Sequence, residues 1–233
     1  MTTCVISPNV SRESARNLAE LLGANYHAAE HNDLRMYDNV INYGSSHDFL
    51  FKKVINHPAA VKICVNKLST FKRIEKDCDV IPWTKDKAIA RQWLDTDGCV
   101  VARANETGSQ NSGLTFCENL STFNAAPAKF YTRMFWHTNE LRLNVYKGKL
   151  LTVYDKIRQK DGTWKFHHVE VKDYPKAIAD MITAIQKHIG IDLYGMDVLV
   201  NKKGQYRLLE VNTGAILHEE TQIALVPILK KEL

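Results

Sequence analysis

Two acidic residues and an asparagine in the last third of the sequence could together bind a metal ion. Asp197 and Glu210 each lie in an apolar run, and Asn212 follows Glu210 at the next position but one. If the chain turns at Lys203-Gly204, Asp197 lies directly opposite Glu210 in a β-hairpin, with Cβ atoms about 5 Å apart. Asn212 then shares the face of Glu210, because side chains alternate along a strand. Opposed like charges destabilise a hairpin unless a cation neutralises them, and oxygen ligands suit Mg²⁺, with Mn²⁺ as an alternative ion.

The same register predicts where the neighbouring apolar side chains point. We expect Val198, Leu209 and Val211 to face away from the carboxylates together. Two alternatives stay open: the carboxylates could be solvated on an exposed face, or the turn could slip by one residue and separate them.

A loop rich in small residues could bind phosphate. Residues 105–113 read Asn-Glu-Thr-Gly-Ser-Gln-Asn-Ser-Gly and lie between two apolar runs that predict strands. Gly108 and Gly113 would let backbone N–H groups approach an anion closely. A plain connection between two strands is the alternative.

The net charge of +5 is concentrated in one segment. Residues 52–76 contain seven basic side chains and a single acid, Glu75. Such a cluster favours an anionic partner, either a nucleotide phosphate or nucleic acid, and a solvated helical face is the alternative.

Several motifs occur in the order found in the ATP-grasp superfamily. They are Asn66-Lys67-Leu68 at the head of a helix, Ile-Pro, Val-Val-x-Arg before the small-residue loop, Glu-Leu-Arg-Leu-Asn-Val, and Gly-Met-Asp followed by Leu-Glu-Val-Asn-Thr-Gly. The sequence resembles this superfamily from about Asn42 to Gly214. It looks most like compact ligases that bacteriophages often encode, which are related to those that add glutamate to ribosomal proteins.

The resemblance implies a fold and a reaction. A nucleotide would lie between two α+β subdomains, and ATP would phosphorylate a carboxylate before an amine displaces the phosphate, forming a carbon–nitrogen bond. The implied partners are ATP, Mg²⁺, and a small-molecule or peptide carboxylate and amine. The acceptor could belong to a protein, and nucleic acid stays open as an alternative partner. An ATP-grasp kinase and a non-catalytic nucleotide-binding or nucleic-acid-binding protein are the alternative functions.

The resemblance also implies nucleotide ligands. Lys67 and Arg103 match positions that contact the ATP phosphates. The segment from Gly108 to Gly113 matches a mobile loop over the phosphates, and the segment from Lys129 to Arg133 matches one whose backbone borders the adenine. The implied residues are Lys67, Arg103, Gly108, Ser109, Gly113, Lys129, Phe130, Tyr131 and Arg133. Packing in a strand core is the alternative for the aromatic side chains.

Further residues match the metal ligands and the catalytic cations of the superfamily. Asp197, Glu210 and Asn212 match the Mg²⁺ ligands. The basic residues near the transferred phosphate are matched by Arg142, Lys156 and Arg158, which would neutralise charge during phosphoryl transfer. A solubilising surface position is the alternative for each of these three cations.

Two departures from the superfamily pattern affect the expected site. Arg103-Ala104 stands where Lys and Pro are usual, which alters the expected phosphate contact. Thr213-Gly214-Ala215-Ile216 replaces a small-residue-Pro-Gly sequence, so the acceptor pocket is not predicted.

The elements that must position these residues suggest an α/β or α+β fold in three parts. We expect a short N-terminal α/β unit over residues 1–58, a first ATP-grasp subdomain over 59–130 and a second over 131–233. Lys147-Gly148 predicts a two-residue hairpin loop, and residues 129–136 predict a strand. Asp173 predicts a helix cap, with Pro175 in the first turn and Gly190 at the end.

Composition excludes several protein classes. The 233 residues are 45% hydrophobic and 24% charged, which is typical of a folded globular protein and excludes disorder, fibres and collagen. No apolar run approaches the roughly 18 residues of a membrane span, and the first residues do not suggest a signal peptide. The five cysteines lack metal-ligand spacing and favour a reducing compartment. We therefore expect a cytoplasmic protein, in the host cytoplasm if a phage encodes it.

Overall fold

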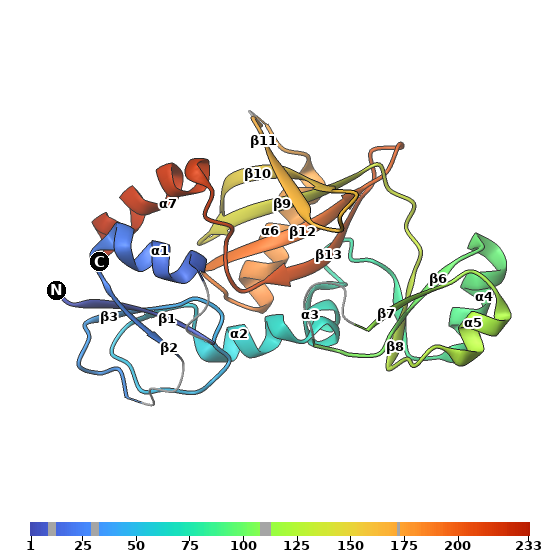
Figure 1. Cartoon of the computed structure of the whole chain (residues 1–233), viewed down its shortest axis with the longest axis horizontal. Helices are drawn as coiled ribbons and strands as arrows, with labels where there is room; N and C mark the ends of the chain where they lie inside the picture. The colour runs from blue at the N-terminus through green and yellow to red at the C-terminus, as the bar shows by residue number, and fades with distance from the viewer. Residues whose placement is uncertain (9–12, 29–32, 108–112, 172) are drawn as a thin grey trace.

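The chain forms three β-sheets that are connected by seven helices, as a computed structural model of residues 1–8, 13–28, 33–107, 113–171 and 173–233 shows. Gly108, Ser109 and the rest of the 108–112 segment lie outside the described residues. In Figure 1 the three sheets follow one another along the longest axis of the molecule. No helix in the described ranges is long and apolar enough to cross a bilayer.

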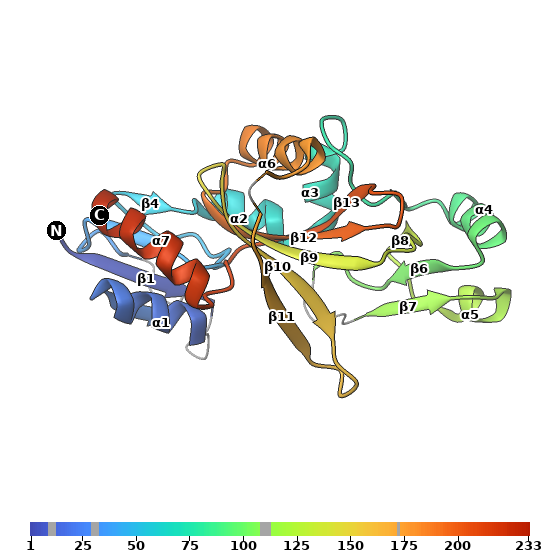
Figure 2. The same cartoon turned by 90° about the horizontal axis from the view of Figure 1, so that it is seen from above.

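The N-terminal sheet is parallel. Its strand order is β2-β1-β3-β4, built from β1 (Thr3–Ser7), β2 (Asn25–Ala28), β3 (Asn39–Asn42) and β4 (Val54–Ile55). Helix α1 (Glu13–Leu22) connects β1 to β2 and buries Ala15 and Leu18. The C-terminal helix α7 (Glu219–Glu232) packs on α1 through Leu225 and Leu229, so both ends of the chain lie at this sheet (Figures 1 and 2).

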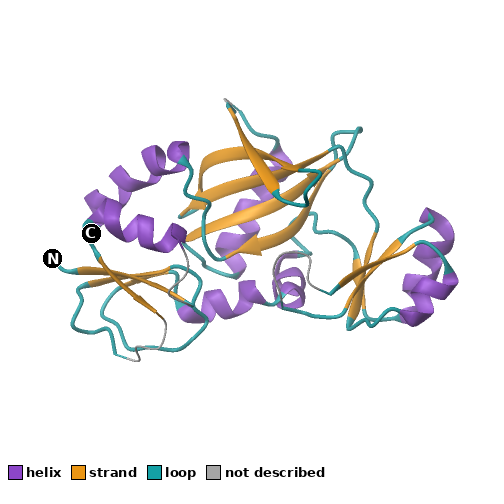
Figure 3. Ribbon diagram, in the orientation of Figure 1, coloured by secondary structure: helices purple, strands orange, loops and turns teal. Residues whose placement is uncertain are grey.

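The largest sheet is antiparallel and forms the centre of the molecule (Figure 3). Its order is β11-β10-β9-β12-β13, built from β9 (Asn139–Tyr146), β10 (Lys149–Arg158), β11 (Trp164–Val169), β12 (Leu193–Val200) and β13 (Tyr206–Asn212). Helices α2 (Pro58–Val65), α3 (Lys67–Ile74) and α6 (Lys176–His188) cover one face, as Figure 2 shows. There Met181 and Ile185 of α6 pack on Leu143 and Met196. The opposite face carries buried polar side chains, among them Arg142, Asn144 and Asp197, so this sheet separates an apolar core from a polar layer.

The third sheet is small. Its order is β5-β8-β6-β7, built from β5 (Trp83–Thr84), β6 (Val100–Arg103), β7 (Leu114–Cys117) and β8 (Phe130–Arg133). Helices α4 (Lys87–Asp97) and α5 (Leu120–Ala125) cover one face with Leu94 and Phe123. The other face carries Val101 and Arg103, and it is this face that turns toward the large sheet.

Local signals in the sequence are confirmed at one turn and corrected at two element ends. Lys147 and Gly148 have φ values of 45° and 76°, as the predicted two-residue hairpin loop requires. The cap of α6 is Pro175 and not Asp173, because the fixed φ of Pro175 leads directly into the helix. Strand β8 ends at Arg133, three residues before the expected end, because Arg133 pairs with Val100, where its partner β6 begins.

Candidate functional site

A cleft of about 760 Å³ lies between the small sheet and the polar face of the large sheet. The side that the small sheet contributes includes Val101, Arg103, Leu114, Phe116 and Thr132. The large sheet contributes the charged part of the lining: Glu140, Arg142, Asp155, Lys156, Arg158, Asp197 and Glu210. The cleft therefore has a strongly charged end, on the large sheet, and an apolar end, where Leu199, Leu209, Met134 and Phe135 lie.

One row of side chains crosses the large sheet strand by strand. Glu210 pairs with Asp197, and Asp197 pairs with Arg142. Arg142 pairs in turn with Tyr154, and Tyr154 with His168. Asp197 and Glu210 lie opposite each other as predicted, but the turn is slipped by one residue. Val200 pairs with Tyr206 and Val198 with Leu208, and a bulge at Leu209 restores the opposition of the two carboxylates. Because paired residues share a face, the row directs two carboxylates and a guanidinium toward the cleft.

Asp197 is fully buried and is neutralised by two cations. Arg142 binds it with two nitrogens, Nε at a short distance to Oδ1 and Nη2 at 3.0 Å from Oδ2. The Lys156 ammonium also lies 3.0 Å from Oδ2. Burial opposes ionisation of Asp197, but Arg142 and Lys156 outweigh it and hold its pKa below the usual range. A solvated Asp197 is thus excluded.

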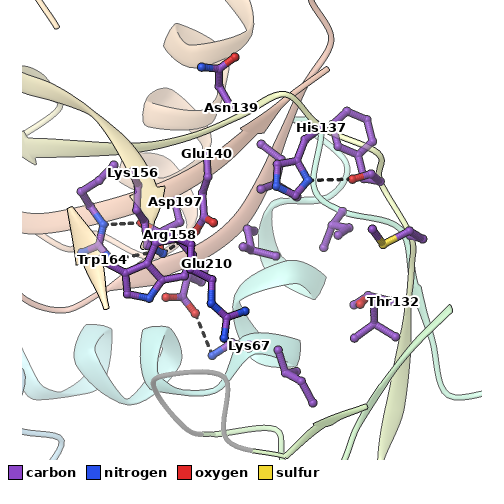
Figure 4. Close-up of a pocket in the computed structure, with 18 of the residues that line it drawn as sticks. Lys67, Thr132, His137, Asn139, Glu140, Lys156, Arg158, Trp164, Asp197 and Glu210 are labelled. Atoms are coloured by element: carbon purple, nitrogen blue, oxygen red, sulfur yellow. Dashed lines mark hydrogen bonds and ion pairs between the residues drawn. The ribbon is translucent and has the colours of Figure 1, made fainter. Parts of the chain in front are cut away.

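Lys156 is held from three sides (Figure 4). Its ammonium lies 2.5 Å from Glu140 Oε1, 3.0 Å from Asp197 and 4.3 Å from the centre of the Trp164 ring. Burial would lower the pKa of Lys156, but the two carboxylates outweigh it and raise that pKa. Burial raises the pKa of Glu140, and Lys156 only partly offsets this. The sequence assigned no role to Glu140 or Trp164, although Glu140 stands two residues before Arg142 and so shares its face.

Glu210 has different partners from Asp197. Its Oε2 lies 3.0 Å from the Lys67 ammonium, and its Oε1 accepts a hydrogen bond of 3.1 Å from the Asn212 amide. Lys67 is the first residue of α3, where the Asn66 side chain caps the helix by accepting from Ser69 N–H. The cap fixes the backbone of Lys67 and leaves its side chain to reach across to β13.

A β-bulge corrects the expected direction of one apolar residue. Val198 pairs with Leu208, so Leu209 is an extra residue between two regular pairs. Val198 and Val211 point into the core beneath α6, as expected, but Leu209 does not. It packs against the cluster that contains Leu199, and both residues line the cleft. Pairing rules alone could not reveal this bulge.

Arg103 is a buried cation in the cleft wall. Arg103 is only 6% exposed. Its Nε donates a hydrogen bond of 3.1 Å to Thr132 Oγ1, and its guanidinium carbon lies 5.8 Å from the centre of the Phe130 ring. Burial lowers the pKa of Arg103 to about 10, against a smaller opposing effect of Glu210. A guanidinium that is desolvated in this way favours an anion in the cleft.

The structure separates the residues that were expected beside an adenine. Phe130 and Tyr131 are buried in two different cores, which confirms the packing alternative for both rings. Lys129 is exposed and does not line the cleft, whereas Arg133 lines it and forms an ion pair with Asp97 at 2.6 Å. The cleft wall continues with Met134 and Phe135.

Gly113 lies at the described end of the small-residue loop. Its φ of 74° is one that glycine adopts readily, and its carbonyl accepts from Ala104 N–H at 2.8 Å. A Cβ atom at Gly113 would lie 3.0 Å from Asn105 Nδ2. Gly113 does not line the cleft, but Asn105 and Thr107 on the other side of the loop do.

Arg158 also faces the cleft, next to Trp164 in the register of β10 and β11. It is exposed, and the alternative of a solubilising surface position therefore stays open for this residue. Arg142 and Lys156, by contrast, are buried in ion pairs and cannot be explained as surface cations.

The basic segment 52–76 does not form one continuous free face. Lys52 pairs with Asp38 at 3.2 Å, Lys62 with Asp48 at 2.5 Å, and Lys67 turns inward to Glu210. This arrangement weakens the case for a nucleic-acid surface.

Comparisons with known proteins support the fold. No family model and no curated protein matches the sequence. The macrocyclase MdnC, solved with the precursor peptide MdnA from Microcystis aeruginosa, is 11% identical with a TM-score of 0.71 over 98% of this chain and 99% of that chain. The ATP-grasp ligase PsnB, solved with a precursor variant, Mg and ADP, is 13% identical with a TM-score of 0.70 over 99% and 97%.

A third solved structure is similar to the same extent. D-alanyl-alanine synthetase A from Vibrio cholerae is 15% identical with a TM-score of 0.68, over 99% of this chain and 93% of that chain. The chain therefore has the ATP-grasp fold, as its motifs predicted.

Proposed function

We propose that this chain is an ATP- and Mg²⁺-dependent carboxylate–amine ligase that works through an acyl-phosphate and releases ADP and phosphate. The observation that carries the proposal is the row of Glu210, Asp197 and Arg142 at the charged end of the cleft. The volume of about 760 Å³ suits a nucleotide together with a second substrate. The fold that the chain shares with ligases, one of them solved with Mg and ADP, supports the same chemistry.

The nucleotide would lie with its base at the apolar end. Leu199, Leu209 and the Met134-Phe135 segment offer apolar contact there. Lys67, 3.0 Å from Glu210, and the buried Arg103 also line the cleft, where they would bind phosphates. The guanidinium of Arg103 can bind phosphate with two N–H groups, unlike the usual lysine. Gly108, Ser109 and Gly113 remain proposed phosphate contacts.

The donor set fits a hard cation. Asp197, Glu210 and Asn212 present only oxygen ligands from one face of the β12–β13 hairpin, and Glu210 borders the cleft. No group of three or more histidine, cysteine or carboxylate side chains is arranged for a metal among the described residues. Phosphate and water oxygens would complete the coordination. Bound Mg²⁺ would neutralise phosphate charge at this position.

The cations beside the row would act on the transferred group. The substrate carboxylate attacks the γ-phosphorus of ATP, the bond to ADP breaks, and an acyl-phosphate forms. The amine then attacks the acyl carbon, loses a proton, and phosphate leaves. Arg142 and Lys156 would hold the phosphoryl group during both steps, and Arg158 at the outer edge would orient the carboxylate substrate.

The proposal includes the organisation and partners of the chain. Residues 59–130 and 131–233 would be the two subdomains that enclose the nucleotide, after an N-terminal unit over 1–58. The partners would be a small-molecule or peptide carboxylate and an amine, because MdnC and PsnB were solved with precursor peptides. We place the reaction in the cytoplasm.

The test is ATP turnover with Mg²⁺ and a mixed pool of amino acids and peptides, with and without hydroxylamine. We expect ADP together with a hydroxamate, whose mass would identify the carboxylate donor. ADP without a hydroxamate, with phosphate on an acceptor hydroxyl, would support an ATP-grasp kinase instead. AMP as product would contradict the acyl-phosphate mechanism.

A further inference from the structure

Both oxygens of Glu210 are already engaged within the protein. Lys67 occupies Oε2 at 3.0 Å, and the Asn212 amide occupies Oε1 at 3.1 Å. An incoming metal ion would therefore compete with a cation of the protein itself. This competition is absent from an ordinary site of open carboxylates.

Lys67 is anchored at its backbone. Its N–H donates to Glu106 carbonyl oxygen at 2.9 Å, and the Asn66 side chain both caps α3 and donates to Glu106 Oε2 at 3.1 Å. Four methylene groups separate this anchored backbone from the ammonium. The ammonium can consequently exchange partners within the cleft while the helix stays in place.

The carboxylates near the row are already paired within the protein. Asp197, Glu210 and Glu140 are in ion pairs with Arg142, Lys156 and Lys67, and Arg103 adds a further buried cation to the cleft. A metal ion alone would add positive charge where no carboxylate is left without a cation. A nucleotide alone would add negative charge beside the carboxylates. Binding of the two together adds much less charge of either sign.

We propose that Lys67 makes metal binding at Glu210 conditional on nucleotide phosphate. This inference rests on the proposed function, since it takes Glu210 as a metal ligand. Metal alone must displace the ammonium and leave a largely buried cation without its carboxylate, which is costly. A phosphate group gives the displaced ammonium a new partner. By linkage, the nucleotide then tightens metal binding, and the metal tightens nucleotide binding by the same factor.

The experiment measures Mn²⁺ binding to the full chain, by the loss of the free-ion EPR signal, with and without a non-hydrolysable ATP analogue, after correction for the Mn²⁺ that the analogue binds in the absence of protein. In the wild type we expect the analogue to tighten Mn²⁺ binding by about tenfold or more. In Lys67→Met we expect Mn²⁺ alone to bind about tenfold more tightly than in the wild type, and the gain from the analogue to fall below about threefold. Lys67→Arg keeps a cation and should keep the coupling.

The control is Lys62→Met, which removes an exposed ion pair with Asp48 on the neighbouring helix. It should leave Mn²⁺ binding unchanged. If the wild type binds Mn²⁺ and Lys67→Met shows the same Mn²⁺ affinity and the same gain from the analogue, the inference is overturned. The proposed metal site would then stay intact. Absence of Mn²⁺ binding in the wild type and both Lys67 variants, with and without the analogue, would instead overturn the metal site and the inference with it.

Discussion

Asp197 and Glu210 lie directly opposite each other on β12 and β13, yet each carboxylate is neutralised by different cations. Arg142 and Lys156 bind Asp197 from β9 and β10, whereas Lys67 reaches Glu210 from α3. Three segments that are distant in the sequence therefore supply the cations that neutralise the two opposed carboxylates. The two residues should consequently respond differently to substitution.

Glu210→Gln should abolish Mg²⁺-dependent ATP turnover, by about 100-fold or more, and keep the fold. The glutamine amide cannot supply the negative charge that a metal ion requires. The fold should be kept because the Glu210 side chain is only partly buried. Turnover is measured as ADP release, and folding by circular dichroism. Glu219→Gln, at an exposed position in the first turn of α7, is the matched control. Wild-type turnover in Glu210→Gln would refute the metal assignment.

Asp197→Asn should lower the free energy of unfolding by about 3–5 kcal/mol. The substitution leaves Arg142 and Lys156 buried without their shared counter-ion. Urea unfolding gives the value. Asp95→Asn breaks the exposed pair with Arg91 within α4 and should cost less than about 1 kcal/mol. If both substitutions lowered the free energy of unfolding equally, burial of the Asp197 ion pairs would contribute nothing to stability.

Asp197 should also give the stability a dependence on pH. Its pKa is held below the usual range because Arg142 and Lys156 outweigh the effect of burial. A carboxyl with a depressed folded pKa adds stability above its unfolded pKa, and that contribution is lost as pH falls through the folded pKa. The difference in unfolding free energy between wild type and Asp197→Asn should therefore shrink below about pH 4. A difference that is constant in urea titrations down to about pH 2 would contradict the pKa direction.

Arg103→Met should weaken binding of an ATP analogue by about tenfold to 100-fold, measured by calorimetry. The buried guanidinium faces the cleft and would lose its phosphate contact. Arg103→Lys should recover only part of the affinity, because an ammonium acts as a point charge and cannot match two phosphate oxygens. The control is Arg91→Met on the exposed side of α4. Full affinity in Arg103→Met would remove Arg103 from the nucleotide site.

Gly214→Ala should destabilise the protein by about 1–3 kcal/mol in urea unfolding. A Cβ at Gly214 would lie 2.6 Å from Tyr43 Cε1, and Tyr43 also donates a hydrogen bond to the Ala215 carbonyl. The penalty should fall when Tyr43→Leu is combined with Gly214→Ala, and it should persist with Tyr43→Phe, which keeps the ring. Additive effects of Gly214→Ala and Tyr43→Leu would show that the two residues do not interact.

Short-range rules predicted much of the hairpin that carries Asp197 and Glu210. A turn at Lys203-Gly204 with strict alternation predicts that those carboxylates lie opposite each other, and they do, but the observed turn is one residue out of that register. The bulge at Leu209 lies between the turn and that pair, and it compensates for the slipped turn so that the carboxylates still face each other. It depends on how β13 packs against the cluster around Leu199, which is a tertiary effect.

The sequence by itself determined the ligand types, the order of the motifs and the expectation of an ATP-grasp fold. Only the tertiary structure decided which cation neutralises which carboxylate, since Lys67, Arg142 and Lys156 reach the β12–β13 hairpin from separate elements. The tertiary structure also decided that Met134 and Phe135 line the cleft, whereas Phe130 and Tyr131 pack in two separate cores. The physical reason is range: turns and alternation are encoded in neighbouring residues, whereas ion pairs and cavity walls depend on how distant segments pack.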